Sequence, residues 1–169
     1  MGAAREGPVG WRVLLRFAAI LIALNLAYYA EKKLGGAVVD EPYTHAVTWT
    51  SAQVARAVLP YSVQSSGRGI VAGGRHSLFI ASGCNGLEAI FLMLAAIAAY
   101  PATWRRRLRG LAWYLPALFA LNLVRVVALV HVAHSHHDLM DVAHYQVAQG
   151  ILILFVLAFW VHYLRGVDG

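Results

Sequence analysis

The sequence has little charge and only one cysteine. Asp, Glu, Lys and Arg make up 13% of its 169 residues, whereas about 25% is usual in soluble domains. Hydrophobic residues make up 60%. This composition argues against an ordinary soluble domain, and it excludes a disordered chain, which needs low hydrophobicity and high charge. The single cysteine, Cys84, excludes an internal disulfide and a four-cysteine zinc site.

Long apolar runs are what the sequence does contain. A helix that crosses a bilayer needs about 20 predominantly apolar residues. Four stretches fit, at about residues 13–30, 78–100, 111–132 and 148–164. The first is longer than the apolar part of a typical signal peptide, which favours an uncleaved anchor over a cleaved signal. We predict an all-α integral membrane protein, in which residues 1–169 form a single polytopic bundle of about four transmembrane helices.

The basic residues predict how the chain is oriented. The net charge is +6, and cytoplasmic loops of membrane proteins carry an excess of Lys and Arg. The link at about residues 101–110 holds four arginines: Arg105, Arg106, Arg107 and Arg109. We therefore expect this link and both termini in the cytoplasm. The positive charge is therefore explained by the orientation of the chain in the lipid bilayer. We expect the bilayer, and not nucleic acid, to be the partner of these basic residues.

Residues 31–77 then form a long loop on the outer side. Alanines and valines at near-helical spacing within residues 43–59 predict an interfacial helix on the membrane surface. Glycines separate short apolar runs between residues 62 and 80, which predicts a small hairpin or an irregular loop.

Two charged residues fall inside predicted spans. Charges there are costly and are functional candidates by default. Counted from the basic link, Glu88 and Arg125 lie at similar depths in the outer half of the bilayer, so we predict an ion pair between them. Asn122, three residues before Arg125, is placed to orient its guanidinium. The alternative interpretation is that the ion pair only fastens two helices together.

Cys84 lies near the predicted outer surface, within the segment Ser82-Gly83-Cys84-Asn85-Gly86. Serine, glycine and asparagine favour turns and helix starts, and a helix N-terminus lowers the pKa of a thiol and offers backbone N–H donors. His144 precedes the last span. The topology thus brings Cys84, Arg125 and His144 to one membrane face as a nucleophile, a cation and a base, the minimum set for acyl transfer.

The same residues also allow two interpretations in which the protein is not a cysteine enzyme. A lone cysteine is often a small core residue, which would make the protein a non-enzymatic membrane scaffold. A histidine-rich tract can bind metal or haem, although it is more often a polar outer loop. That tract includes His131, His134, His136 and His137, followed by Asp138 and Asp141. The prediction that we favour contains no metal and no cofactor.

Three short motifs resemble those of the exosortase/archaeosortase family, and they look most like exosortase H. They are Ser-Gly-Cys84-Asn85-Gly-Leu-Glu88, then Asn122-Leu-Val-Arg125-Val, and then His144-Tyr-Gln-Val-Ala-Gln149. The resemblance covers about residues 70–164. Gly150 follows His144 by six residues, whereas in many exosortases the glycine follows the histidine closely. Many members are also longer, with about eight spans, so this chain keeps only a core.

The resemblance implies a membrane-embedded cysteine protease or transpeptidase of the inner (cytoplasmic) membrane, with its active site on the outer face. Such enzymes cleave exported proteins that end in a short motif, a transmembrane helix and a basic tail, and they transfer or release the product. The family triad corresponds to Cys84 as nucleophile, Arg125 as oxyanion stabiliser and His144 as general acid and base. We expect Glu88, Asn122 and Asn85 to support the triad.

Overall fold

The computed structural model describes residues 9–36, 38–74 and 76–165. Along the chain it contains α1 (Val9–Lys33), α2 (Asp40–Val58), β1 (Val63–Ser66), β2 (Gly69–Ala72), β3 (His76–Phe79), α3 (Leu87–Ala99), α4 (Trp104–Ser135), the 3₁₀ turn η1 (His137–Leu139), the π-helical segment η2 (Val142–Ala148) and α5 (Gln149–Arg165).

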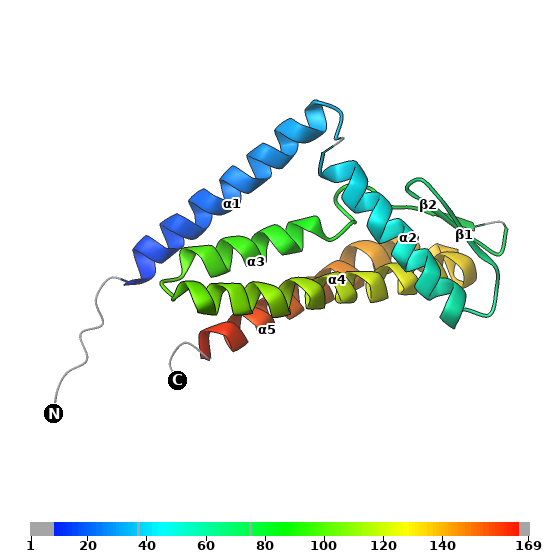
Figure 1. Cartoon of the computed structure of the whole chain (residues 1–169). Helices are drawn as coiled ribbons and strands as arrows, with labels where there is room; N and C mark the ends of the chain where they lie inside the picture. Colours follow the sequence, from blue (N-terminus) through cyan, green and yellow to red (C-terminus); the bar gives the residue numbers. More distant parts are fainter. Residues whose placement is uncertain (1–8, 37, 75, 166–169) are drawn as a thin grey trace.

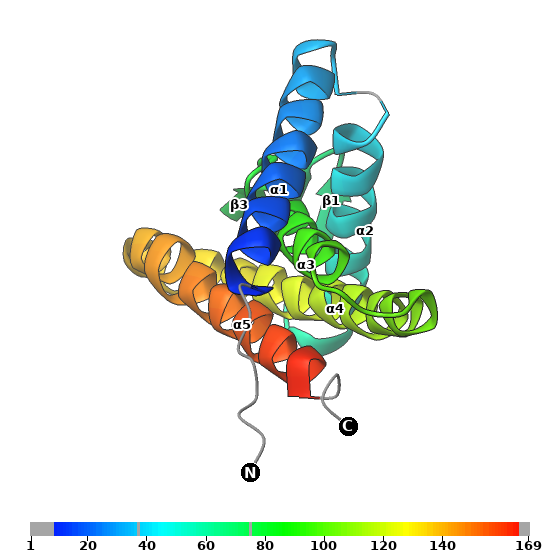
Figure 2. The same ribbon diagram turned by 90° about the vertical axis from the view of Figure 1, so that its left-hand side faces the viewer.

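Helices α3, α4 and α5 pack on one another, and α1 packs mainly on α3 (Figures 1 and 2). The 32 residues of α4 extend for about 48 Å, which is longer than a bilayer core of about 30 Å. At one end α4 lies beside α3 and α5, and at the other it supports α2 and the sheet (Figure 1). This helix therefore joins the apolar bundle to the part of the molecule formed by α2 and the sheet, which the sequence predicts on the outer side.

Two hydrophobic cores follow from this arrangement. One lies between α2, the sheet and α4, and it includes Val47, Ile70 and Val130. The other lies between α3, α4 and α5, and it includes Met93 and Leu118. Because α4 contributes to both cores, the outer part and the bundle are packed as one unit.

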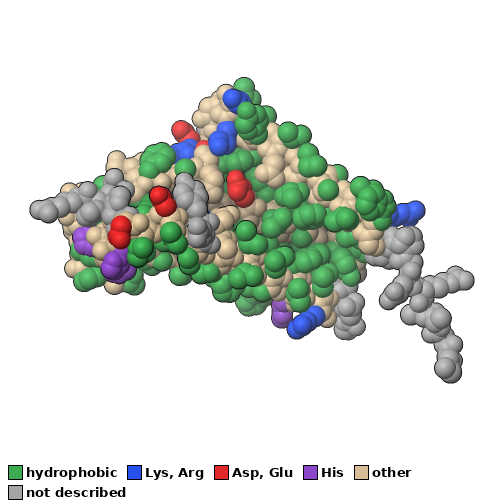
Figure 3. Space-filling view, turned by 180° about the vertical axis from the view of Figure 1, so that it is seen from behind, with side chains coloured by type: hydrophobic (Ala, Val, Ile, Leu, Met, Phe, Trp, Pro, Cys, Tyr) green, Lys and Arg blue, Asp and Glu red, His purple; other side chains and the backbone are tan. Residues whose placement is uncertain are grey.

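Three of the described segments are long and apolar enough to cross a membrane: Gly10–Lys33, Trp104–Ser135 and Val142–Arg165. In Figure 3, hydrophobic side chains form a broad area over one face, and most charged side chains lie around its margin. The predicted class of all-α membrane protein is confirmed. Helix α3 is apolar, but its 13 residues reach only about 20 Å, and the number of four spans stays a prediction.

Two predicted boundaries differ from the structure. The sequence predicts residues 78–86 within a span, but they form the end of β3 and a turn, and α3 begins only at Leu87 after the left-handed Gly86. The basic link expected at 101–110 is largely helical, because α4 begins at Trp104. Pro101 explains where α3 stops, since Tyr100 before it takes the extended conformation that a following proline favours.

The predicted outer loop contains the expected helix, α2, and a three-stranded antiparallel sheet in the order β1-β2-β3. The register pairs Val63 with Ala72, and Ile70 with Leu78. The buried side of α2 packs on this sheet and on α4, while Trp49 on its other side is exposed. The predicted hairpin is therefore part of a folded outer unit.

A buried carboxylate ties this outer unit together. Asp40, the first residue of α2, is only 3% exposed. Its Oδ2 accepts hydrogen bonds from Arg68 Nη2 at 2.6 Å and from Ser82 Oγ at 3.0 Å, and its Oδ1 accepts one from the Tyr28 hydroxyl. Asp40 thus connects α1, α2, the β1–β2 turn and the segment before α3. Arg68 and Asp40 form the only ion pair among the described residues.

We predict that Asp40→Asn lowers the free energy of unfolding by about 2 kcal/mol, because it weakens hydrogen bonds to a charged group. Thermal unfolding in detergent measures the change. Glu41→Gln is the matched control, since it removes an exposed carboxylate one residue further along the same helix. Equal effects of the two substitutions would contradict a special role for Asp40.

The same carboxylate predicts a dependence of stability on pH. Burial favours the neutral acid, but hydrogen bonds from Tyr28, Arg68 and Ser82 outweigh it and hold the pKa of Asp40 below its ordinary value of 3.8. A lowered pKa stabilises the fold above the pKa of the unfolded chain, and the stabilisation is lost as the pH falls through the folded value. Melting curves between pH 7 and pH 3 should converge for the wild type and Asp40→Asn. A constant difference would contradict the prediction.

Candidate active site

Cys84 lies in the turn between β3 and α3, three residues before the helix begins. Its backbone N–H donates to the carbonyl of Ala81 at 2.8 Å, which closes the turn. The thiol is partly buried, and burial raises its pKa, while the charge of Arg125 opposes the rise and that of Glu88 adds to it. The lowered pKa expected at a helix start is therefore wrong. A thiol of this kind needs a base in order to react.

His144 supplies a base within hydrogen-bonding distance. Its Nε2 lies 3.0 Å from Cys84 Sγ, although 60 residues separate the two along the chain. His144 belongs to the π-helical segment η2, and such segments are frequent at functional sites. The pair matches the geometry of a nucleophile and its activating base. The side chains of residues 145 and 146 in the same motif lie outside the described part.

Arg125 comes from the middle of α4 and is only 9% exposed. Its charge acts on both Cys84 and His144. Within the described part of the chain, its Nε and Nη1 atoms have no hydrogen-bond partner. Leaving a buried cationic donor unpaired is costly, so the site keeps two N–H groups ready for an anion or a developing oxyanion.

Glu88 shares a space with Arg125 but does not pair with it. Both residues line a cavity of about 250 Å³ together with Gly83 and Gly86, next to Cys84 in the chain. Glu88 is exposed at the start of α3, and the described residues contain no ion pair between it and Arg125. The predicted ion pair therefore does not form, because equal depth in a membrane does not specify which way each helix turns its side chains.

Asn85 connects the cysteine turn to α2 and is 0% exposed. Its Nδ2 donates to Thr44 Oγ1 at 2.9 Å and to Asp40 Oδ1 at 3.5 Å, both on α2. Its Oδ1 accepts the backbone N–H of Leu87 at 3.0 Å and so fixes the start of α3. Both ends of the amide are therefore engaged, and the backbone beside Cys84 has one defined path.

Asn122 holds the same turn from α4. Its Nδ2 donates to the backbone carbonyl of Asn85 at 2.6 Å, and the residue is 1% exposed. The sequence predicts that Asn122 orients Arg125, but among the described contacts its hydrogen bond goes to the cysteine turn. Gly86 makes this approach possible, because its φ is +84° and an added Cβ would lie 2.6 Å from Asn122 Cγ.

The histidine tract packs on a tyrosine. His131 Nδ1 and the Tyr61 hydroxyl are 3.2 Å apart, and the ring of His134 stacks on Tyr61 with centroids 3.9 Å apart. His136 is exposed, and the side chain of His137 lies outside the described part. The described residues contain no group of three His, Cys, Asp or Glu side chains that could hold a metal ion.

Sequence reasoning missed the residues that hold the turn from the outer loop, namely Asp40, Thr44 and Arg68. The available signal was an acidic residue just before a predicted helix, which is typical of a helix start. The contacts themselves join segments 28 to 45 residues apart.

We predict that Gly86→Ala destabilises the protein by about 1–3 kcal/mol, the cost of a non-glycine residue in a strained conformation. The clash with Asn122 adds to this cost. Gly83→Ala is the control, because its φ is not positive and an added Cβ would meet nothing closer than 3.9 Å. Thermal unfolding of the two variants measures the difference, and equal melting temperatures would contradict the prediction.

Comparison with known proteins agrees with this geometry. A family model described as transmembrane exosortase matches residues 7–163. Searches of the curated proteins and of the solved structures found no match. The matched range contains Cys84, Arg125 and His144 and covers most of the chain, so the resemblance seen in the sequence is confirmed at the level of the family. The chain belongs to the transmembrane exosortase family.

Proposed function

We propose that this protein is a cysteine transpeptidase or peptidase that cleaves the C-terminal sorting signal of exported proteins. The observation that carries the proposal is the 3.0 Å contact between Cys84 Sγ and His144 Nε2. The buried N–H groups of Arg125, which have no partner among the described residues, support it, because a scaffold has no use for such donors.

The reaction starts from a neutral thiol beside the imidazole, since burial raises the pKa of Cys84. His144 Nε2 takes the thiol proton as the sulfur attacks the scissile carbonyl, and a C–S bond forms. The carbonyl oxygen becomes an oxyanion, which the N–H groups of Arg125 stabilise. When the C–N bond breaks, His144 gives the proton to the leaving amine. An amine, a lipid-linked group or water then cleaves the thioester and frees Cys84.

In the proposed topology the site is on the outer face of the inner membrane and both termini are cytoplasmic. Cys84 lies just before the first turn of α3, and the arginines at the start of α4 lie just after the last turn of α3. The whole length of α3 therefore separates Cys84 from these arginines. An excess of arginine marks the cytoplasmic side. The substrate would therefore be cleaved after its export.

The test uses a co-expressed substrate that ends in a motif, an apolar helix and a basic tail. We expect Cys84→Ala to abolish cleavage, and Arg125→Gln to slow it by about 10²–10³-fold, the usual effect of removing an oxyanion donor. Immunoblotting of substrate and product measures both. The scaffold alternative predicts instead that Cys84→Ser changes neither the cleavage of the substrate nor the amount of folded protein. It also predicts that Arg125→Ala lowers only the amount of folded protein.

We further propose that the apolar helix of the substrate lies in the crevice between α1 and α5, with α3 as its floor. A cavity of about 440 Å³ there is lined by apolar residues, including Leu14 of α1, Ala96 of α3 and Leu157 of α5. It shares Leu92 and Val156 with the cavity that reaches Arg125. Small residues such as Ala96 allow close approach of a second helix within a membrane.

Two neighbouring leucines of α1 test this route. Leu14 lines the crevice and is 56% exposed, whereas Leu15 is 51% exposed and is not part of its lining. We expect Leu14→Trp to reduce cleavage about 10-fold, the loss of about 1.4 kcal/mol of binding, and Leu15→Trp to leave it unchanged. Equal rates for the two variants, at equal protein levels, would contradict the proposed route.

A further inference from the structure

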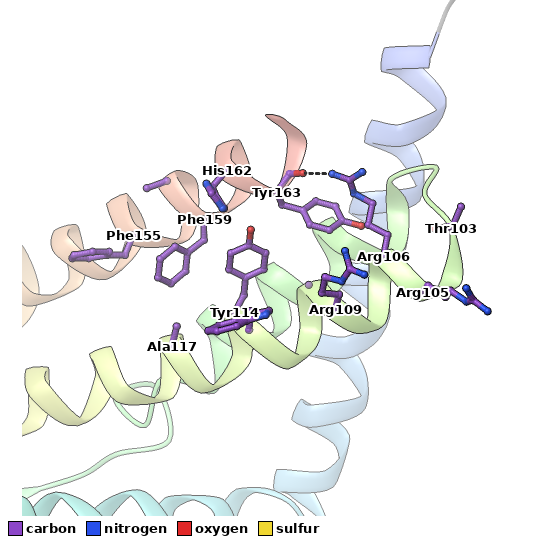
Figure 4. Close-up of a pocket in the computed structure, with 13 residues that line it drawn as sticks. Thr103, Arg105, Arg106, Arg109, Tyr114, Ala117, Phe155, Phe159, His162 and Tyr163 are labelled. Atoms are coloured by element: carbon purple, nitrogen blue, oxygen red, sulfur yellow. Dashed lines mark hydrogen bonds between the residues drawn. The ribbon is translucent and has the colours of Figure 1, made fainter. Parts of the chain in front are cut away.

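A large cavity lies between α4 and α5 at the arginine-rich end of the bundle, at the opposite end of α3 from Cys84. Its volume is about 990 Å³, which is within the usual range for ligand sites. Figure 4 shows that side chains of both helices point into it, with Tyr114 of α4 facing Phe159 of α5. This cavity takes no part in the proposed cleavage reaction.

One end of the cavity is strongly basic. Arg105, Arg106 and Arg109 line it from the first two turns of α4 (Figure 4). The described acidic residues belong to the last turn of α1, the starts of α2 and α3, and the segment around η1. None of the three arginines forms an ion pair within the described part of the chain. The charge at this end therefore attracts an anion from outside the protein.

A buried hydroxyl lies beside these arginines. Tyr163 of α5 lines the cavity and is only 4% exposed, yet among the described residues its hydroxyl has no hydrogen-bond partner. The guanidinium of Arg106 lies 5.7 Å from the centre of the Tyr163 ring, and its Nη2 donates to the Tyr163 carbonyl at 3.4 Å. An unpaired buried hydroxyl costs free energy, which a ligand with an acceptor oxygen would recover.

Apart from Thr103 and His162, the rest of the cavity is lined mainly by apolar and aromatic side chains. Trp113 and Ala117 of α4 line it, as do Phe155 and Phe159 of α5. Trp113 is 73% exposed and Phe155 is 40% exposed, and both belong to segments long and apolar enough to span the membrane. The cavity is therefore open to lipid along this side. A ligand that fills it needs an anionic head and a hydrocarbon tail.

We propose that this cavity binds an anionic phospholipid of the bilayer. The phosphate lies among Arg105, Arg106 and Arg109 and accepts a hydrogen bond from the Tyr163 hydroxyl. One acyl chain lies against Phe155 and Phe159. Arginine binds phosphate by charge-assisted hydrogen bonds, and basic pockets between membrane helices are known to bind anionic lipid head groups.

Charge and shape argue against two other ligands for this cavity, a basic peptide and a small soluble anion. A peptide with a basic tail, such as the proposed substrate, would be repelled by the three arginines. A small soluble anion would satisfy the arginines but would leave the aromatic wall without a partner. Only an amphipathic anion uses both halves of the cavity.

The experiment measures lipid binding to the purified, delipidated full chain in a neutral detergent, by native mass spectrometry. We expect phosphatidylglycerol to bind, and the double variant Arg105→Gln/Arg109→Gln to weaken binding about 30-fold, as two lost surface cations imply. The matched control is Arg12→Gln/Arg165→Gln, which removes the same charge from two exposed arginines that are not part of the cavity lining. The control should bind within about twofold of the wild type.

Tyr163→Phe provides a second variant that keeps the ring and its packing. Removal of the hydroxyl should weaken phosphatidylglycerol binding about 10-fold, the effect of one hydrogen bond to a charged group. Equal losses in the two double variants would overturn the proposal, because the charge would then act only as a general surface potential. Equal binding of phosphatidylcholine would also overturn it, and so would competition by inorganic phosphate at equal concentration.

Discussion

The rest of the site depends on one buried network, which begins at the carboxylate of Asp40. Through Ser82 and Asn85 it holds the residues on both sides of Cys84, and Asn122 closes the network from α4. The thiol of Cys84, the proposed nucleophile, is therefore on a turn, yet the turn is fixed by two helices. A catalytic group held to a narrow range of positions loses less rate to misalignment than one on a free loop. The outer unit of α2 and the sheet thus serves as the support of the site.

Two groups of arginines that have no acidic partner among the described residues line cavities, one near Cys84 and one at the opposite end of α3. Arg125 is single, buried and next to a thiol, whereas Arg105, Arg106 and Arg109 are grouped at the edge of a large cavity. In a protein with 13% charged residues, unpaired cations at such places are expensive to maintain. The first set fits a charge that forms during a reaction. The second fits a charge that is permanently present in the bilayer.

Much of this architecture follows from the sequence, because hydropathy, basic residues and three short motifs each report a local property. They predict the class of protein and they single out Cys84, Arg125 and His144. The predicted ion pair between Glu88 and Arg125 is wrong. Equal depth in the membrane does not determine the direction in which each helix presents its side chains. The pKa of Cys84 is raised and not lowered, chiefly because the thiol is partly buried, and no sequence motif reports burial. The Asp40 network joins distant segments through single hydrogen bonds, and such contacts leave no periodic pattern.

Helix α4 is continuous from the arginine cluster to Arg125, so it fixes the distance between these two sites along the helix axis. The 20 residues from Arg105 to Arg125 fix these two guanidinium-bearing positions about 30 Å apart along the axis. Consider a partner helix that lies beside α4 and begins level with Arg105. Its far end is level with Arg125 only if the helix has about 20 residues. Removal of one helical turn leaves that end about 5.4 Å short. In the proposed mechanism, the length of a substrate helix, as well as its sequence, then decides whether its cleavage site reaches the thiol.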